Sequence, residues 1–367
     1  MTAQAQAAPG AETAVASPVS AHNEWDPLEE VIVGTIDGAA IPPWHVSLQA
    51  TMPAESWPLF RERGGSQWPP DELKRAAEEL DGFAELLESD GVTVRRPDAL
   101  DHGREFGTPD WRSSGGPSAA FPRDVMLVVG DRMIESALGW RSYYFAIHAF
   151  RPIVLDYFRR GARWVAAPRP MLRDELFRED VDPDGHEFEP VAGELEPLLD
   201  AGDLMRCGRD LIVQRSHVTN RLGIEWLHRL LGDEYRLHEV EFDDSHPMHV
   251  NATFLPLAPG KVLVNPERVK RVPELFEGWD VLVPPESAIP RDWPMYMCSR
   301  WISLNVLMLD ERRVMVEAGE KPLIDAFESW GFEPIPCPFR WVNTFGGGFH
   351  CATSDVRRRG PLEDYFD

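Results

Sequence analysis

Residues 124–134 have the sequence Asp-Val-Met-Leu-Val-Val-Gly-Asp-Arg-Met-Ile, in which two apolar runs flank Gly130-Asp131. This pattern predicts a β-hairpin, because a Gly-Asp pair between two such runs favours a tight turn. The residues that follow predict a helix over about 141–160 and a strand over 162–166. The stretch therefore predicts a unit in which a hairpin is followed by a helix and a strand.

The same order of elements recurs along the rest of the chain. Further hairpins are predicted at 204–214, 249–264 and 301–317. Their helices are predicted at 223–231, 272–276 and 321–330, and their last strands at 235–240, 280–283 and 333–335. An incomplete first unit has a strand at 31–33, a long irregular segment over 38–70, a helix at 70–90 and a strand at 91–94.

Five such units favour an α/β fold built as a circular array of ββαβ modules, a propeller with pseudo-fivefold symmetry. An open α/β sheet would also fit the alternation of strands and helices. The hairpins, which require antiparallel pairing, favour the array.

The chain has 367 residues, with 61 acidic and 37 basic side chains and a formal net charge of −24. This charge argues against binding of nucleic acid, which needs a basic surface, and against docking on anionic lipid. No apolar stretch is long enough to cross a membrane, and the first residues lack the basic start and apolar core of a signal peptide. We therefore expect a cytoplasmic protein with a disordered tail over residues 1–20 and a single domain over residues 21–367.

Four cysteines are present, Cys207, Cys298, Cys337 and Cys351. None belongs to a CxxC pair, and no cysteine–histidine spacing is typical of structural zinc. Free cysteines usually pack as small apolar side chains, so this is the default expectation for each of the four.

Three segments combine reactive side chains with turn residues. In Gly346-Gly-Gly-Phe-His-Cys351, a cysteine follows three glycines, so it is either an accessible nucleophile or a buried thiol beside a packed turn. His249, Asn251 and Thr253 would share one face if residues 249–253 form a strand, which is either a functional face or a solvated edge. Leu199–Asp203 is an acidic loop, and acidic turns are common. Together a cysteine, a histidine and an aspartate can form a nucleophile, a proton carrier and its partner carboxylate.

Several motifs resemble the glycine amidinotransferase family, which includes arginine:glycine and arginine:inosamine-phosphate amidinotransferases. They are SAHNEWDPL at 20–28, FPRD at 121–124, QRSHVTN at 214–220, PMH at 247–249, SLNVLML at 303–309 and GGGFHCATSDVRRR at 346–359. The resemblance extends from about residue 20 to the C-terminus. It implies a five-module α/β propeller with the active site in its central channel, and a homodimer.

The resemblance also implies roles for individual residues. Cys351 matches the family's nucleophile, His249 its general acid and base, and Asp200 the carboxylate that partners the histidine. Asp124 matches a carboxylate that binds the guanidinium of the donor. Arg268 and Ser299 resemble the residues that hold the donor's α-carboxylate.

One position departs from the family pattern as we interpret it, because Asn251 stands where His-x-Asp would place a second carboxylate. An amide oxygen still accepts a hydrogen bond, but it supplies no charge. His246 and Cys298 also differ, from Asn and Ser, which indicates an acceptor other than glycine.

The first hypothesis is transfer of an amidino group from L-arginine, through a covalent intermediate on Cys351, to an amine acceptor in natural-product biosynthesis. It requires no metal and no organic cofactor. The alternative is an acyltransferase or hydrolase of the same fold, in which Cys351 attacks a neutral acyl ester or thioester. A non-catalytic scaffold that binds a small molecule is a third possibility, and the combination of Cys351, His249 and Asp200 argues against it.

Overall fold

The computed structural model describes residues 17–180 and 188–366. The strands are β1 (Leu28–Val33), β2 (Thr93–Arg95), β3 (Phe106–Gly107), β4 (Arg112–Ser113), β5 (Met126–Val129), β6 (Arg132–Glu135), β7 (Arg163–Ala166), β8 (Leu204–Cys207), β9 (Asp210–Gln214), β10 (Arg236–Val240), β11 (Phe254–Ala258), β12 (Lys261–Val264), β13 (Asp280–Leu282), β14 (Leu307–Met308), β15 (Arg313–Glu317), β16 (Glu333–Cys337) and β17 (Thr353–Arg358). The α-helices are α1 (Val46–Thr51), α2 (Trp57–Arg63), α3 (Pro70–Ser89), α4 (Pro122–Val125), α5 (Ile147–Arg159), α6 (Arg221–Leu231), α7 (Lys321–Ser329) and α8 (Arg340–Thr344).

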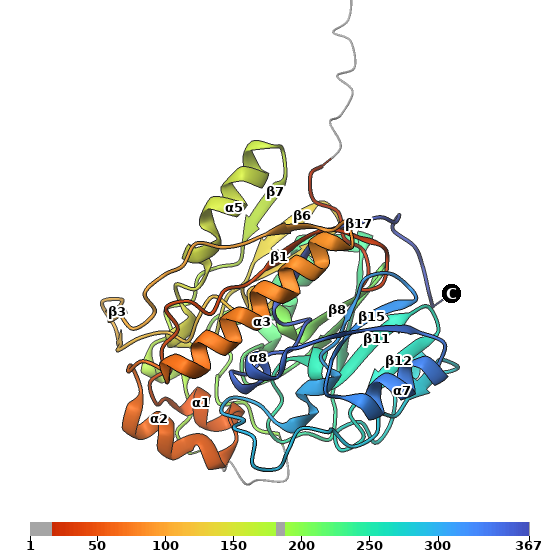
Figure 1. Cartoon of the computed structure of the whole chain (residues 1–367). Helices are drawn as coiled ribbons and strands as arrows, with labels where there is room; N and C mark the ends of the chain where they lie inside the picture. The colour runs from red at the N-terminus through yellow and green to blue at the C-terminus, as the bar shows by residue number, and fades with distance from the viewer. Residues whose placement is uncertain (1–16, 181–187, 367) are drawn as a thin grey trace, which may run out of the picture.

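Five three-stranded sheets share one topology. In β5–β6–β7, β8–β9–β10, β11–β12–β13 and β14–β15–β16, the first two strands are antiparallel and the third is parallel to the second. The fifth sheet joins the two ends of the chain, because β17 pairs antiparallel with β1, and β2 lies parallel to β1 (Figure 1). A helix separates the last two strands of each sheet, as the α/β prediction requires. In the sheet β11–β12–β13 this helix is only the 3₁₀ turn η7 (Glu274–Phe276).

The hairpin predicted at 124–134 is present, with its first strand beginning slightly later than expected. Met126 pairs with Glu135 and Val129 with Arg132, and Gly130 turns the chain with a φ of +57°. All four residues of β5 are buried, which explains their continuous apolar sequence. Asp124 lies before the strand, on the short helix α4.

Three predictions of local structure were wrong. Residues 249–253 do not form a strand, because His249 has a φ of +62° and Val250–Ala252 form the 3₁₀ turn η6, so the expected shared face does not exist. The segment 38–70 is not wholly irregular, because it contains α1 and α2, which lie together at the lower edge of Figure 1. Strand β14 is likewise shorter than predicted, since Arg300–Leu304 form the 3₁₀ turn η8.

The tail predicted for residues 1–20 lies mostly outside the described residues. Of its last residues, Val19 is fully buried and Ser20 forms a β-bridge with Arg357. These two residues therefore pack against the rest of the chain.

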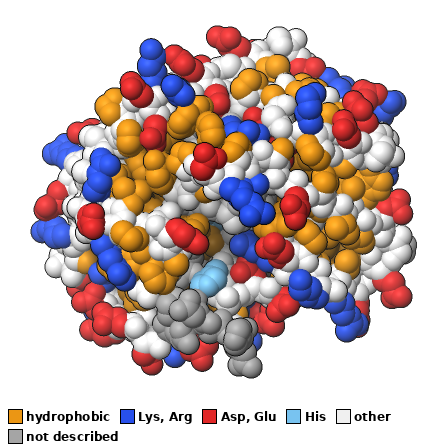
Figure 2. Space-filling view, turned by 60° about the horizontal axis from the view of Figure 1, so that its bottom comes forward, with side chains coloured by type: hydrophobic (Ala, Val, Ile, Leu, Met, Phe, Trp, Pro, Cys, Tyr) orange, Lys and Arg blue, Asp and Glu red, His pale blue; other side chains and the backbone are white. Residues whose placement is uncertain are grey.

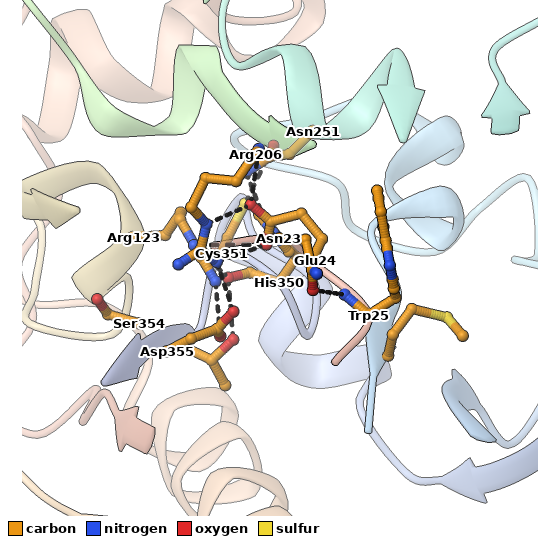
Figure 3. A network of polar contacts seen from close by, with 12 residues as sticks. Asn23, Glu24, Trp25, Arg123, Arg206, Asn251, His350, Cys351, Ser354 and Asp355 are labelled. Carbon is orange, nitrogen blue, oxygen red and sulfur yellow. Dashed lines mark hydrogen bonds and ion pairs between the residues drawn. The ribbon is translucent and has the colours of Figure 1, made fainter. Parts of the chain in front are cut away.

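A network of buried charges ties distant segments together next to the turn that carries Cys351 (Figure 3). Arg206 Nη2 lies 2.7 Å from Glu24 Oε2 and 2.6 Å from Asp355 Oδ2. Arg123 and Arg358 reach the same Asp355 carboxylate over 2.9 and 2.8 Å. Buried ions are tolerated only when they are paired in this way, because desolvation of an unpaired charge costs several kcal/mol.

The surface shows no segregation of charge on the face seen in Figure 2, where acidic and basic side chains are intermixed among hydrophobic ones. Among the described helices, none has the length and apolar character needed to cross a bilayer.

Candidate active site

A cavity of about 270 Å³ collects nearly all of the predicted site residues. Its walls are formed by Thr51, Met52, Pro53, Ala54, Trp57, Phe121, Asp124, Trp140, Tyr143, His246, Met248, His249, Asn251, Ala252, Arg268, Met297, Cys298, Ser299, Ile302, Phe345, Gly346 and Cys351. Asp200 does not line the cavity and lies behind His249. The segment that contains α1 and α2, which was predicted as a long irregular segment, forms one wall of the cavity.

His249 lies between two carboxylates at the floor of this cavity. Its Nε2 is 3.1 Å from Asp200 Oδ1, and its Nδ1 is 3.6 Å from Asp124 Oδ1. Burial would lower the pKa of His249, but the charges of Asp124 and Asp200 outweigh it and raise this pKa well above its usual value. A donor atom each of Asp124, His249 and Cys351 lie within 4.8 Å of one another, so the sulfur, the imidazole and a carboxylate share one small volume.

Local geometry rather than a strand places the His249 ring. The positive φ of His249 directs the chain into η6, and its backbone N–H donates to Asp203 Oδ1 over 2.8 Å. Gly202 makes room for the ring, since a Cβ at that residue would lie 2.7 Å from two imidazole carbons. The acidic loop therefore contributes its glycine and its second aspartate as well as Asp200.

Cys351 is held by its backbone at the end of the glycine run. Its N–H donates to Asn305 Oδ1 over 2.9 Å, while Asn305 Nδ2 donates to the carbonyl of Asn251 over 3.0 Å. Gly347 and Gly348 leave room for Phe121 and Asn305, which an added Cβ would meet at 2.1 and 2.6 Å. The glycines thus allow the turn that carries Cys351 to pack closely against Phe121 and Asn305.

Asp124 presents an unsatisfied oxygen at the cavity. Its Oδ1 is buried and accepts no hydrogen bond. Burial, together with the charges of Asp200 and Asp203, raises the pKa of Asp124 above its usual value despite the opposing effect of His249. Burial and the charge of Asp200 likewise raise the pKa of Asp203 to about 7. Three carboxyl groups around one imidazole make the site favourable for a cation.

Asn251 is fully buried and connects the cavity to the charged network (Figure 3). Its Nδ2 lies 3.0 Å from His350 Nδ1, and its Oδ1 lies 3.7 Å from the Cys351 sulfur. His350 Nε2 lies 3.1 Å from Glu24 Oε2. Asn251 is therefore part of the site, because it lines the cavity beside the Cys351 sulfur and is hydrogen-bonded to His350 on its other side.

The remaining predicted residues lie elsewhere on the cavity wall. Arg268 is held by Asp244, at 3.0 Å from its Nε, and by the Thr253 hydroxyl, at 3.2 Å from its Nη1. His246 Nδ1 lies 3.0 Å from the carbonyl of Ala50 at the end of α1. Ser299 is exposed at the mouth, beside Cys298, whose thiol donates to the carbonyl of Asn343.

Sequence reasoning missed several residues of the site. Tyr143 and Trp140 are buried wall residues, of which Tyr143 lies in the segment predicted as helix and Trp140 directly before it. Asp203 could have been singled out, because it is the second acid of a loop that already held Asp200. Asn305 lies within the apolar stretch 303–309, where a buried polar residue is a local exception.

The donor set of Asp124, His249 and Cys351 could also hold a metal ion, since thiolate and imidazole suit soft divalent metals. The same three side chains are those that a metal-free thiol mechanism would use. The prediction that the reaction needs no metal or organic cofactor stays a prediction.

Comparison with known proteins gives close relatives over nearly the whole chain, although no protein-family model matches it. The L-arginine:L-lysine amidinotransferase of Pseudomonas savastanoi pv. phaseolicola is 50% identical over 351 residues, covering 95% of this chain and 97% of that protein. SxtG, an amidinotransferase from Microseira wollei in the saxitoxin biosynthetic pathway, has a TM-score of 0.91 at 45% identity, over 95% of this chain and 100% of the other. The inosamine-phosphate amidinotransferase StrB1 from Streptomyces griseus has a TM-score of 0.87 at 38% identity, over 96% of this chain and 100% of the other.

A shared fold alone would leave the chemistry open, whereas these relatives are 38–50% identical over nearly the whole chain. The chain therefore belongs to the amidinotransferase family and is a transferase.

Proposed function

We propose that this chain moves an amidino group from L-arginine to an amine acceptor through a covalent intermediate on Cys351. The proposal rests on the proximity of Cys351, His249 and Asp124 in one cluster. The Oδ1 atom of Asp124 is buried there and accepts no hydrogen bond. A guanidinium is a planar cation that carboxylates bind well, and it would offset the excess of carboxyl groups around His249. A neutral acyl donor, the alternative chemistry, would leave these charges uncompensated.

The donor would span the cavity. Asp124 accepts hydrogen bonds from the guanidinium nitrogens, and the Asn251 carbonyl oxygen accepts a further N–H. Arg268 and Ser299 bind the α-carboxylate. This arrangement places the guanidino carbon next to the sulfur of Cys351.

The first half-reaction breaks the bond between the guanidino carbon and the δ-nitrogen of arginine. The Cys351 thiolate attacks the carbon and forms a C–S bond, and the His249 imidazolium gives its proton to the departing nitrogen. Ornithine leaves, and an amidino-thioether remains on Cys351. Asp200 stabilises the imidazolium and fixes the ring, as the carboxylate of a catalytic triad does.

The second half-reaction reverses these steps with the acceptor. His249 removes a proton from the acceptor amine, the nitrogen attacks the amidino carbon, and the C–S bond breaks. The thiolate and imidazolium are restored, so no net oxidation or hydrolysis occurs. Related amidinotransferases act on lysine or on inosamine phosphate, and one belongs to saxitoxin biosynthesis, which supports an amine acceptor within natural-product biosynthesis.

The five sheets of equal topology support a closed five-module propeller around this cavity, within a single domain over residues 21–367. The pairing of β17 with β1 in the fifth sheet supports a ring, because it joins the last strand of the chain to the first. A cytoplasmic homodimer without nucleic-acid or membrane partners completes the proposal.

Intact mass measurement after incubation with L-arginine alone tests the proposal. We expect the protein to gain one amidino group, with release of ornithine, and peptide mapping should place the group on Cys351. The Cys351→Ala variant should stay unmodified. Cys337→Ala is the matched control, because Cys337 is a buried cysteine outside the cavity, and it should be modified like the wild type. Unmodified wild-type protein without ornithine release would refute arginine as the donor.

A further inference from the structure

Three buried side chains next to Cys351 are connected by hydrogen bonds in the order Glu24, His350 and Asn251 (Figure 3). The distances are 3.1 Å from Glu24 Oε2 to His350 Nε2 and 3.0 Å from His350 Nδ1 to Asn251 Nδ2. All three residues are at most 2% exposed, so water does not compete for these groups. Each hydrogen in the row can therefore be assigned from its neighbours.

The first group in this row, the Glu24 carboxyl, is ionised. Burial would raise the pKa of this carboxyl, but Arg206 and Arg123 outweigh it and hold the pKa well below its usual value. An ionised carboxylate only accepts hydrogen bonds, so His350 must donate to it from Nε2. Burial and the charge of Arg123 lower the pKa of His350 to about 4, against the raising effect of Glu24 and Asp355. The ring is therefore neutral, and its Nδ1 carries a lone pair.

The lone pair at His350 Nδ1 decides the orientation of Asn251. Only the NH₂ group of the amide can face an acceptor, so the carbonyl oxygen must point the other way. On that side lies Cys351, whose sulfur is 3.7 Å from Asn251 Oδ1.

We propose that His350 is a positioning residue that turns the Asn251 carbonyl oxygen toward the nucleophile, where it accepts a guanidinium N–H of the donor. The inference rests on the proposed function for the identity of the donor. It also explains why residue 251 works as an amide in this chain. A carboxylate at residue 251 would face the lone pair of His350 Nδ1, and a hydrogen bond between them would require a second proton on the ring. The charges around this ring are already those of two arginines, Arg123 and Arg206, and two carboxylates, Glu24 and Asp355.

A purely structural role for the His350 ring is disfavoured by Asn305, which already holds the backbone of both segments. Asn305 accepts from the N–H of Cys351 and donates to the carbonyl of Asn251. Its own carbonyl accepts from the N–H of His350 over 3.3 Å. The ring is therefore not needed to hold these segments together, and what it adds is the direction of the amide.

The tautomer of His350 can be read directly from the wild-type protein by two-bond ¹H–¹⁵N NMR of the histidine rings, with the ring assigned through its own backbone resonances. We expect a neutral ring protonated at Nε2 from about pH 5 to about pH 9, in contrast to the usual titration of histidine in this range. A ring protonated at Nδ1, or an imidazolium, would overturn the proposal. This measurement involves no donor, so it holds whether or not arginine proves to be the substrate.

Two substitutions separate the two hydrogen bonds of the ring. His350→Asn can place an amide oxygen where Nδ1 lies and keep the partner of Asn251, whereas His350→Gln can reach Glu24 but offers no acceptor to Asn251. For amidination of Cys351, we expect His350→Gln to raise the half-saturating arginine concentration at least tenfold and His350→Asn to raise it less than about threefold.

A double-mutant cycle completes the test. If His350 acts through Asn251, then His350→Gln should have little further effect on the half-saturating arginine concentration in an Asn251→Ala background. Equal effects of the two His350 variants, or additive effects with Asn251→Ala, would refute the proposal. If the His350 variants do not fold, the NMR tautomer of the wild type decides. A wild type that arginine does not modify would refute the proposed function and leave the amide orientation to the same NMR measurement.

Discussion

The backbone N–H of His249 donates to Asp203 Oδ1 over 2.8 Å, and it does so from a residue whose φ is +62°. A side chain other than glycine in this region costs roughly 1–3 kcal/mol, so the surroundings must enforce it. Asp203 is itself fixed, because the Ser216 hydroxyl donates to its Oδ2 over 2.6 Å. The proton carrier of the proposed reaction is thus held by an acid that touches its backbone and not its ring.

Replacement of Asp203 tests this relationship. Asp203→Ala removes the acceptor of the His249 N–H, so we expect the ring to leave its place and kcat to fall about tenfold or more. Asp203→Asn keeps an oxygen for that N–H and should stay within about threefold of the wild type. Steady-state rates and circular dichroism of both variants check the prediction, and equal losses in the two variants would contradict it.

Gly202 should be equally sensitive to added volume. A Cβ at this residue would lie 2.7 Å from the His249 ring, so Gly202→Ala should displace the imidazole and lower kcat at least tenfold. The matched control is Gly82→Ala on the exposed side of α3, where a Cβ meets nothing within 4 Å. That change should leave kcat unaltered and stabilise the helix by about 0.5–1 kcal/mol. Wild-type kinetics for Gly202→Ala would show that the close approach is unimportant.

Arg268 should determine affinity for the donor more than the rate of the chemical step. It lines the cavity, and Asp244 holds its guanidinium in place. We expect Arg268→Ala to raise KM for arginine about 10- to 100-fold with a smaller change in kcat, because a hydrogen-bonded charge pair with the α-carboxylate is lost. Arg271→Ala, at an exposed arginine that pairs with Glu274, is the control and should leave both constants unchanged. A pure kcat effect would argue against a carboxylate-binding role.

Glu79 should make stability depend on pH through helix α8, which leads into the turn that carries Cys351. One oxygen of Glu79 accepts from the N–H groups of Trp341 and Val342, and burial raises the pKa of Glu79 to about 7. An acid whose pKa is higher in the folded state loses stability as pH rises from about 4.5 to about 7. Glu79→Gln keeps the accepting oxygen and removes the charge, so its advantage in unfolding free energy over the wild type should grow across this range by on the order of 2 kcal/mol.

Thermal or urea unfolding at about pH 5 and about pH 8 measures this difference. Glu78→Gln is the control, because Glu78 is exposed on the same helix and pairs only with Lys74 at 3.8 Å. A difference between Glu79→Gln and the wild type that does not change with pH would show that the Glu79 carboxyl is not destabilised by burial.

The hairpins and most helices could be predicted from the sequence because their causes are local. Apolar runs on either side of a glycine turn explain β5 and β6, and a 3–4 spacing of leucines and Phe83 explains α3. Residues 249–253 were wrongly predicted as a strand, because their alternation of polar and apolar residues is typical of strands. The actual turn depends on the hydrogen bond from His249 to Asp203, 46 positions away.

The α/β class, the repeating hairpin units and the candidates Cys351, His249 and Asp200 follow from the amino-acid sequence, because turn residues, apolar patterns and motifs are properties of short segments. The orientation of these side chains follows from contacts between distant segments of the folded chain. The orientation of the Asn251 amide depends on His350, which is 99 positions away in the sequence. The tautomer of His350 depends in turn on Glu24, which is 326 positions from His350. Such orientations depend on which donors and acceptors become hydrogen-bond partners once burial has excluded water. These partners are far apart in the sequence, so a local pattern of residues does not predict them.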